Sequence, residues 1–262
     1  MEHAHDNLSQ TLSDLNKAIN SDPFDARLYF ERGVIFGNLE EFDWAITDFT
    51  KAIELIPFLS PAFFQRGLCY FEKGELIRAI SDYTETIGID AGTASTLSYY
   101  NRAIAYDAQG ELSKAIEDYS KAIELDSESI DFYGMRGRAY FAHDKPNKAI
   151  ADYTKCIEIE PNNAIPYSDR ALAYYALGEL DKSIEDYNKA IEIDPIYWGA
   201  YFGRGNVYYD LGESGKALAD CNKTIEIDPT LANCYLARGK VYHNLGELDK
   251  SIEDYNKAIE ID

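Results

Sequence analysis

The sequence predicts an all-α solenoid of antiparallel helix pairs, and three observations lead to this prediction. The stretch LGELDKSIEDYNKAIEID occurs twice, at 177–194 and 245–262, unchanged over all 18 residues. An arginine followed by Gly or Ala recurs every 34 residues, with a single interval of 36. Between these arginines the apolar residues have the spacing of helices and not of strands. A fixed period of this length is typical of repeat proteins, whose units pack on their neighbours.

The recurring arginine divides the chain into an N-terminal segment and seven units. Residues 1–25 form that segment, which holds a degenerate half-repeat because LNKAINSDP at 15–23 matches the end of a unit. The seven units are 26–59, 60–93, 96–129, 130–163, 164–197, 198–231 and 232–262. The two additional residues of the longer interval fall in AGTAST at 91–96, where small and polar residues predict a loop. Positions below are counted from the first residue of a unit.

The first half of each unit predicts an amphipathic helix. In the fifth unit Tyr167, Ala171 and Tyr174 follow one another along one helical face. A glycine at position 15 can end this helix in a left-handed conformation at little steric cost. Five units have it, as Gly74, Gly110, Gly178, Gly212 and Gly246. In the fourth unit Asp144 stands at that position.

The second half of each unit predicts another amphipathic helix. In the fifth unit Ser183, Tyr187 and Ala190 lie on one face of it. Proline cannot continue a helix, so a proline near the end of a unit predicts where the second helix stops. Such prolines are Pro23, Pro57, Pro161, Pro195 and Pro229.

These units resemble the tetratricopeptide repeat, a helix–turn–helix motif of 34 residues. Position 4 is aromatic in every unit: Tyr29, Phe63, Tyr99, Tyr133, Tyr167, Tyr201 and Tyr235. A Gly or Ala follows at position 8, another aromatic residue at position 11, and an Ala or Ser at position 20. The resemblance covers the chain beyond residue 14 and implies a right-handed superhelical solenoid that serves as a protein-interaction scaffold.

The charge of the chain limits the classes of partner. With 25 Lys and Arg against 46 Asp and Glu, the formal net charge is −21. Nucleic-acid binding relies on cationic contacts to phosphates, so we expect no nucleic-acid partner. No apolar run approaches the length of a membrane span, and the start MEHAHDNLSQ lacks the pattern of a signal peptide. We expect a cytoplasmic protein without membrane insertion, with its acidic residues on a solvated outer surface.

No motif in the sequence predicts catalysis. His143 and His243 each lack a Cys, Ser or second His at the spacing of a nucleophile or ligand set. The carboxylates recur with the repeat, which is typical of solvated helix faces. The four cysteines lack metal-ligand spacing, and two of them stand at positions that hold Ala and Tyr in other units, so we expect packing thiols in a reducing compartment. They are Cys69, Cys156, Cys221 and Cys234. We predict no enzyme activity, no cofactor and no metal.

One position departs from the family pattern. Position 7, usually Leu, is arginine in all seven units: Arg32, Arg66, Arg102, Arg136, Arg170, Arg204 and Arg238. Since a cation on a packing face needs a partner, a recurrent acid is expected nearby. Position 23 of the second helix supplies one in every unit: Asp48, Asp82, Asp118, Asp152, Asp186, Asp220 and Asp254. We predict a ladder of structural ion pairs; the alternative is a row of arginines that faces an acidic ligand.

The resemblance also implies where a partner would bind, namely on the concave face, which is formed mainly by the first helices. The apolar residues there that form the predicted groove are Phe30, Phe64, Leu68, Phe71, Tyr100, Phe141, Tyr175, Phe202 and Tyr209. The family's carboxylate clamp needs a Lys at position 5 and an Asn at position 9 of one unit, and no unit has both. An aromatic track suits an extended or helical segment of another protein. The alternative for about half of these side chains is packing between repeats.

Two further expectations concern the role and the end of the chain. The principal function predicted is a scaffold without chemistry of its own; the alternative is the recruitment arm of a larger enzyme or assembly machine. No polar capping helix follows the seventh unit, although terminal repeats normally need one. We therefore expect either that the native chain continues past Asp262 or that this end self-associates with another copy.

Overall fold

Helix pairs make up the structure, a computed structural model that describes residues 2–90 and 92–261. Every regular element in these ranges is an α-helix. The chain forms two compact units, Met1–Ser127 and Glu128–Asp262. The all-α fold predicted from the sequence is confirmed.

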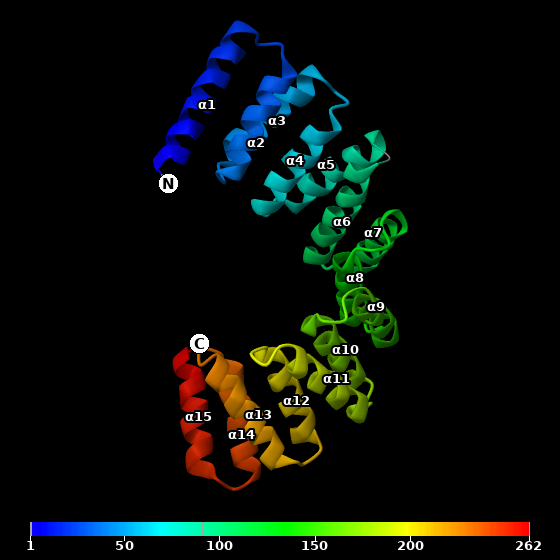
Figure 1. Cartoon of the computed structure of the whole chain (residues 1–262), viewed down its shortest axis with the longest axis vertical. Coiled ribbons are helices and arrows are strands. Elements are labelled where there is room, and N and C mark those ends of the chain that lie inside the picture. Colours follow the sequence, from blue (N-terminus) through cyan, green and yellow to red (C-terminus); the bar gives the residue numbers. More distant parts are fainter. Residues whose placement is uncertain (1, 91, 262) are drawn as a thin grey trace. The chain divides into compact units, whose positions relative to one another are not determined.

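The first compact unit holds a single helix followed by three pairs (Figure 1). The single helix is α1 (Glu2–Ser21). The pairs are α2 (Ala26–Asn38) with α3 (Phe42–Leu55), α4 (Ser60–Glu72) with α5 (Leu76–Ile89), and α6 (Thr93–Ala108) with α7 (Leu112–Leu125).

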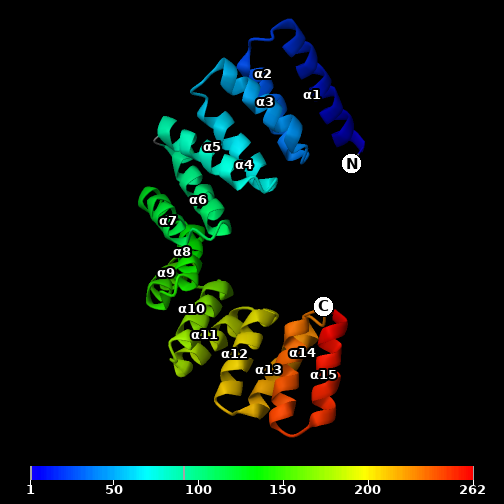
Figure 2. The ribbon, with the colours of Figure 1, turned by 180° about the vertical axis from the view of Figure 1, so that it is seen from behind.

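The second compact unit holds four pairs. They are α8 (Ile130–Ala142) with α9 (Pro146–Ile159), α10 (Ala164–Ala176) with α11 (Leu180–Ile193), α12 (Trp198–Asp210) with α13 (Ser214–Ile227), and α14 (Ala232–Asn244) with α15 (Leu248–Ile261). The first helices α10, α12 and α14 contact one another in succession, and each second helix also contacts the first helix of the next pair. Figure 2 shows the same succession from behind. The first helices therefore form one layer of the unit.

Helix ends follow the residues that predicted them. The five position-15 glycines have φ between +73° and +78°, and the N–H of the residue after Gly74 donates back to the carbonyl of Tyr70 at 2.8 Å. Pro23 lies two residues beyond the end of the single helix α1, and the other four closing prolines lie two residues beyond the end of a second helix. The predicted helix ends at the position-15 glycines and before the closing prolines are thus confirmed.

The loop expected at 91–96 is wrong in its extent. Residue 91 lies outside the described residues, but α6 already begins at Thr93 and has 16 residues, where the other first helices have 13. The backbone N–H of Ser95 donates to the carbonyl of Gly92 at 3.0 Å. The longer interval is therefore taken up mainly by almost one additional turn of helix at the start of α6.

Small residues hold the two helices of each pair close together. Ala45, Ala79, Ala115, Ala149 and Ala217, all at position 20, have no exposed surface. The larger buried side chains include Phe49, Tyr83, Tyr119 and Tyr187 at position 24. The core thus combines small side chains at position 20 with large rings at position 24, which suits close packing between helices.

Asp144 has the left-handed conformation that glycine has in five other pairs, with φ of +54°. We expect Asp144→Gly to raise the free energy of unfolding by about 1 kcal/mol, because a side chain disfavours this conformation. Gly178→Ala, at φ of +75°, is the matched control and should lower it by about 1 kcal/mol. Urea denaturation of the variants measures both; a less stable Asp144→Gly protein contradicts the expectation.

Candidate functional site

The recurrent arginines and aspartates meet within each helix pair. In all seven pairs the arginine Nε and Nη2 donate to the two carboxylate oxygens of the aspartate, at 2.7–2.9 Å. The aspartate side chains are 4–8% exposed and those of the arginines 15–21%. Two parallel hydrogen bonds make this the strong, orienting form of the ion pair.

The same guanidinium groups also reach the preceding helix pair. Nη1 of Arg66 donates to Thr50 Oγ1 at 2.9 Å, and Nη1 of Arg170 donates to Thr154 Oγ1 at 3.0 Å. The arginine is flanked by aromatic rings, as Arg170 is by Tyr167 at 5.8 Å and Tyr174 at 5.9 Å. These donors are therefore directed at acceptors of the chain itself, which favours a packing role over a ligand site.

In the first compact unit the predicted groove residues lie on the first helices α2, α4 and α6 and are half-buried. Three of them pair with a position-24 ring of their own helix pair. Phe30 lies 5.8 Å from Phe49, Phe64 lies 6.0 Å from Tyr83, and Tyr100 lies 5.9 Å from Tyr119, between ring centroids. These tilted pairs show that part of the predicted track packs on the core.

In the second compact unit three of the predicted residues come together. Tyr175 of α10 and Phe202 and Tyr209 of α12 line one hollow of about 360 Å³. Phe141 does not join them and packs instead against the buried cluster of Ala149, Tyr153 and Ala173. This hollow is the candidate site, because it lies across the layer of first helices and has the size typical of ligand pockets.

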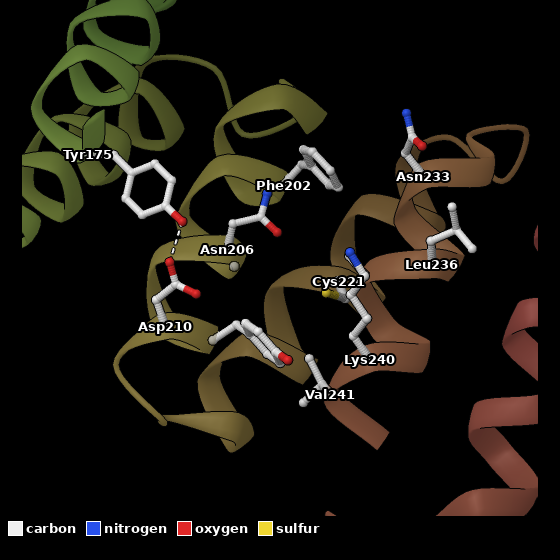
Figure 3. Close-up of a pocket in the computed structure, with 12 residues that line it drawn as sticks. Tyr175, Phe202, Asn206, Asp210, Cys221, Asn233, Leu236, Lys240 and Val241 are labelled. Atoms are coloured by element: carbon white, nitrogen blue, oxygen red, sulfur yellow. Dashed lines mark hydrogen bonds between the residues drawn. The ribbon is translucent and has the colours of Figure 1, made fainter. Parts of the chain in front are cut away.

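Figure 3 shows side chains of α12 and α14 on two sides of the hollow, with Cys221 of α13 between them. Sequence reasoning missed several of the lining residues: Gly205, Cys221, Asn233, Ala237 and Val241. One signal was present, since Cys221 replaces the aromatic residue that every other unit has at position 24.

Polar groups lie at the rim of the hollow. The Tyr175 hydroxyl donates to the carboxylate of Asp210 (Figure 3), and this hydrogen bond, together with burial, raises the pKa of Tyr175 to about 12. The Tyr209 hydroxyl accepts from Asn244 Nδ2 at 2.8 Å. The amine of Lys240 and the amides of Asn206 and Asn233 are further lining groups. The hollow therefore combines aromatic walls with donors and acceptors suited to a peptide backbone.

A second polar feature lies between α8 and α10. Arg138 Nε donates to the Asp169 carboxylate at 3.2 Å. Burial raises the pKa of Asp169, and the charge of Arg138 acts in the opposite direction. Arg138, at position 9 of the fourth unit, thus forms an ion pair within the chain.

The thiol in the hollow is neutral at physiological pH. Burial raises the pKa of Cys221 to about 12, and the thiolate is the nucleophilic form. Among the described residues no group of three or more His, Cys, Asp or Glu side chains is placed to hold a metal ion. In the same residues no helix has the length and apolar character needed to span a membrane.

Comparisons with known proteins agree with the geometry. Family models described as TPR repeat match residues 137–178, 171–212 and 205–246, and others described as tetratricopeptide repeat match 26–58, 97–129 and 232–262. A search of curated proteins found no match.

Solved structures show the same fold. A tetratricopeptide repeat protein from Parabacteroides merdae is 23% identical, with a TM-score of 0.74 over 90% of this chain and 93% of that one. The C-terminal part of a TPR repeat-containing protein from Cytophaga hutchinsonii is 21% identical, with a TM-score of 0.75 over 89% and 95%. MamA is 27% identical, with a TM-score of 0.54 over 61% of this chain and 93% of its own.

Proposed function

Because the chain belongs to the tetratricopeptide repeat family, a family of protein-interaction scaffolds, we propose that it binds a segment of a partner protein in the hollow across α10, α12 and α14. The segment is extended or helical and lies along the layer of first helices. The chain acts by holding this partner and carries out no reaction of its own.

The observation that carries the proposal is the convergence of Tyr175, Phe202 and Tyr209 on one hollow. All three are half-buried, so each keeps a face that a partner can cover. Aromatic side chains in pockets are the usual anchors of protein interfaces, since they bury a large area with few rotatable bonds. The rim groups, Asn206 and Lys240 among them, can donate to the carbonyl groups of a peptide.

The repeat sequence supports different roles for the first helices and the second helices. The stretch 177–194, which contains second helix α11, recurs unchanged at 245–262, which contains α15. The first helices that precede these copies differ in sequence. A scaffold with interchangeable outer helices and distinct first helices places recognition on the first helices. The recruitment arm of a larger enzyme or assembly machine would use the same hollow, so both functions share one test.

The test compares groove variants with variants on an outer helix. Peptides are selected from a random displayed library against the wild-type chain, and their affinities are measured by calorimetry. We expect Tyr175→Ala and Phe202→Ala each to weaken binding by roughly 1–3 kcal/mol, because each removes an aromatic anchor. Circular dichroism should show unchanged helicity.

Glu185→Ala and Lys189→Ala on α11 are the matched controls, since neither residue lines the hollow. They should bind the selected peptides as the wild type does. The proposal is abandoned if these outer variants lose affinity while Tyr175→Ala and Phe202→Ala bind normally.

A further inference from the structure

Position 24 of the second helix carries an aromatic ring in every unit except the sixth. The rings are Phe49, Tyr83, Tyr119, Tyr153, Tyr187 and Tyr255, and the sixth unit has Cys221. A cysteine side chain is much smaller than a phenol ring. The sixth unit therefore lacks the ring that every other unit has at this position.

The glycines at position 8 show where this ring lies in four of the pairs. A Cβ atom added at Gly33, Gly67, Gly137 or Gly239 would come within 2.7–2.8 Å of the position-24 ring of the same pair. At Gly205 the nearest atom would be Asp220 Cβ at 3.3 Å, with Cys221 Sγ at 3.8 Å. No ring atom is therefore among the nearest neighbours of Gly205.

Phe202 lines the hollow beside Gly205 and Cys221. It stands at position 5, as do Phe30, Phe64 and Tyr100. Those three form tilted ring pairs with the position-24 rings of their own pairs, with interplanar angles of 50–55°. In the pair of Phe202, position 24 is Cys221 and not a ring. Phe202 therefore has no ring partner at this position, and it lines the hollow together with Cys221.

The next helix pair supplies the third side. In two other pairs of this compact unit a position-24 ring shares a buried cluster with position 10 of the following pair, Tyr153 with Ala173 and Tyr187 with Val207. Val241 is the corresponding residue for Cys221. Val241, Gly205 and Phe202 all line the hollow of about 360 Å³, and Figure 3 shows Phe202 and Val241 on the helices that border it. The hollow is therefore lined by the residues that correspond to the neighbours of a position-24 ring in other pairs.

We infer that this hollow receives an aromatic side chain, phenylalanine or tyrosine, of the bound partner segment. The partner's ring takes the position that the chain's own ring has in the other pairs, tilted against Phe202 and packed on Gly205 and Val241. Rings prefer such tilted contacts, which an aliphatic side chain cannot form. This inference rests on the proposed function, because it names the side chain by which the partner is recognised.

The direct test uses small probes that reproduce the side chains. The full chain is titrated with p-cresol and with toluene, which correspond to tyrosine and phenylalanine, while NMR follows the resonances of Cys221, Phe202 and Val241. We expect saturable shifts confined to this hollow. In Cys221→Tyr, whose new ring repeats the arrangement of the other pairs, both probes should bind at least tenfold more weakly. Equal binding to the two proteins overturns the inference, as does the absence of saturable shifts in the wild type.

Tyr153→Cys is the converse variant, and it carries the test if Cys221→Tyr does not fold. Tyr153 packs over Gly137, so its removal copies the arrangement of Gly205 and Cys221 in another pair. A second set of shifts, around Gly137 and Ala173, is expected with p-cresol. Isobutanol serves as the aliphatic probe; if it binds the wild-type hollow as tightly as toluene does, the preference for a ring is refuted.

The selected peptides separate the two proposals. Peptides that bind in the hollow should contain an aromatic residue and should lose at least tenfold in affinity for Cys221→Tyr. If they lose affinity for Phe202→Ala and Tyr175→Ala but not for Cys221→Tyr, the proposed function stands and the aromatic occupant is wrong. If p-cresol binds beside Cys221 while peptide affinity ignores the groove variants, the ring site stands and the proposed function fails.

Discussion

Arg170→Leu is expected to lower the free energy of unfolding by about 3–5 kcal/mol, the range for removing one partner of a buried ion pair. The substitution leaves the carboxylate of Asp186, 8% exposed, without the two hydrogen bonds that now satisfy it. It also removes the hydrogen bond to Thr154, which connects two successive pairs. Guanidinium denaturation, followed by circular dichroism of the full chain, measures the loss.

A double variant separates the cost of an unpaired charge from the value of the pair. Arg170→Leu with Asp186→Leu should recover much of the stability, because no buried charge then remains. Arg78→Leu is the control, since Arg78 forms an exposed ion pair with Glu75 and such pairs contribute little. If Arg170→Leu unfolds at the wild-type denaturant concentration, the ladder does not stabilise the fold.

Gly203→Ala should lower the free energy of unfolding by about 3 kcal/mol, at the upper end of the usual cost of overpacking. An added Cβ would approach the ring of Tyr187 to less than 3.0 Å, and Tyr187 is 2% exposed. In that pair position 8 is Ala171 and not glycine, and the ring lies against Gly203 of the next pair. Tyr187 belongs to a buried cluster with Tyr167 and Val207, so a shift of the ring would disturb packed neighbours.

Another helical glycine, Gly134 of α8, provides the control for Gly203→Ala. A Cβ at Gly134 would meet only Cys156 Sγ, at 4.0 Å, so Gly134→Ala should raise stability through its better helix propensity. Combining Gly203→Ala with Tyr187→Leu should cost less than the sum of the two single changes, because the smaller side chain relieves the clash. If thermal melts give Gly203→Ala and Gly134→Ala the same melting temperature, this account of the packing is contradicted.

The sequence predicted the elements and their ends because the signals for them are local. Apolar spacing depends on the geometry of a single helix, and Gly178 and Pro195 limit the backbone at their own positions. Arg170 and Asp186 could be matched because a repeat places the same two residues in every unit. The run at 91–96 was misjudged for the same local reason, since small polar residues suit a loop as well as a first helical turn.

The candidate site could be predicted only in part. Tyr175, Phe202 and Tyr209 were identified because the family resemblance assigns their positions to the concave face. Phe141, chosen on the same ground, packs on a buried cluster, and no local pattern distinguishes the two outcomes. Whether an aromatic side chain covers the core or borders an open hollow depends on what the facing helix supplies.

What the sequence by itself determined is the helical repeat, the pairing of arginine with aspartate and the exchange of a ring for Cys221. Only the tertiary structure decided what that exchange does. Gly205 is on α12, Cys221 on α13 and Val241 on α14, and together they border a single hollow. The hollow beside Cys221 is a property of the three helices packed together, because its walls come from residues far apart along the chain.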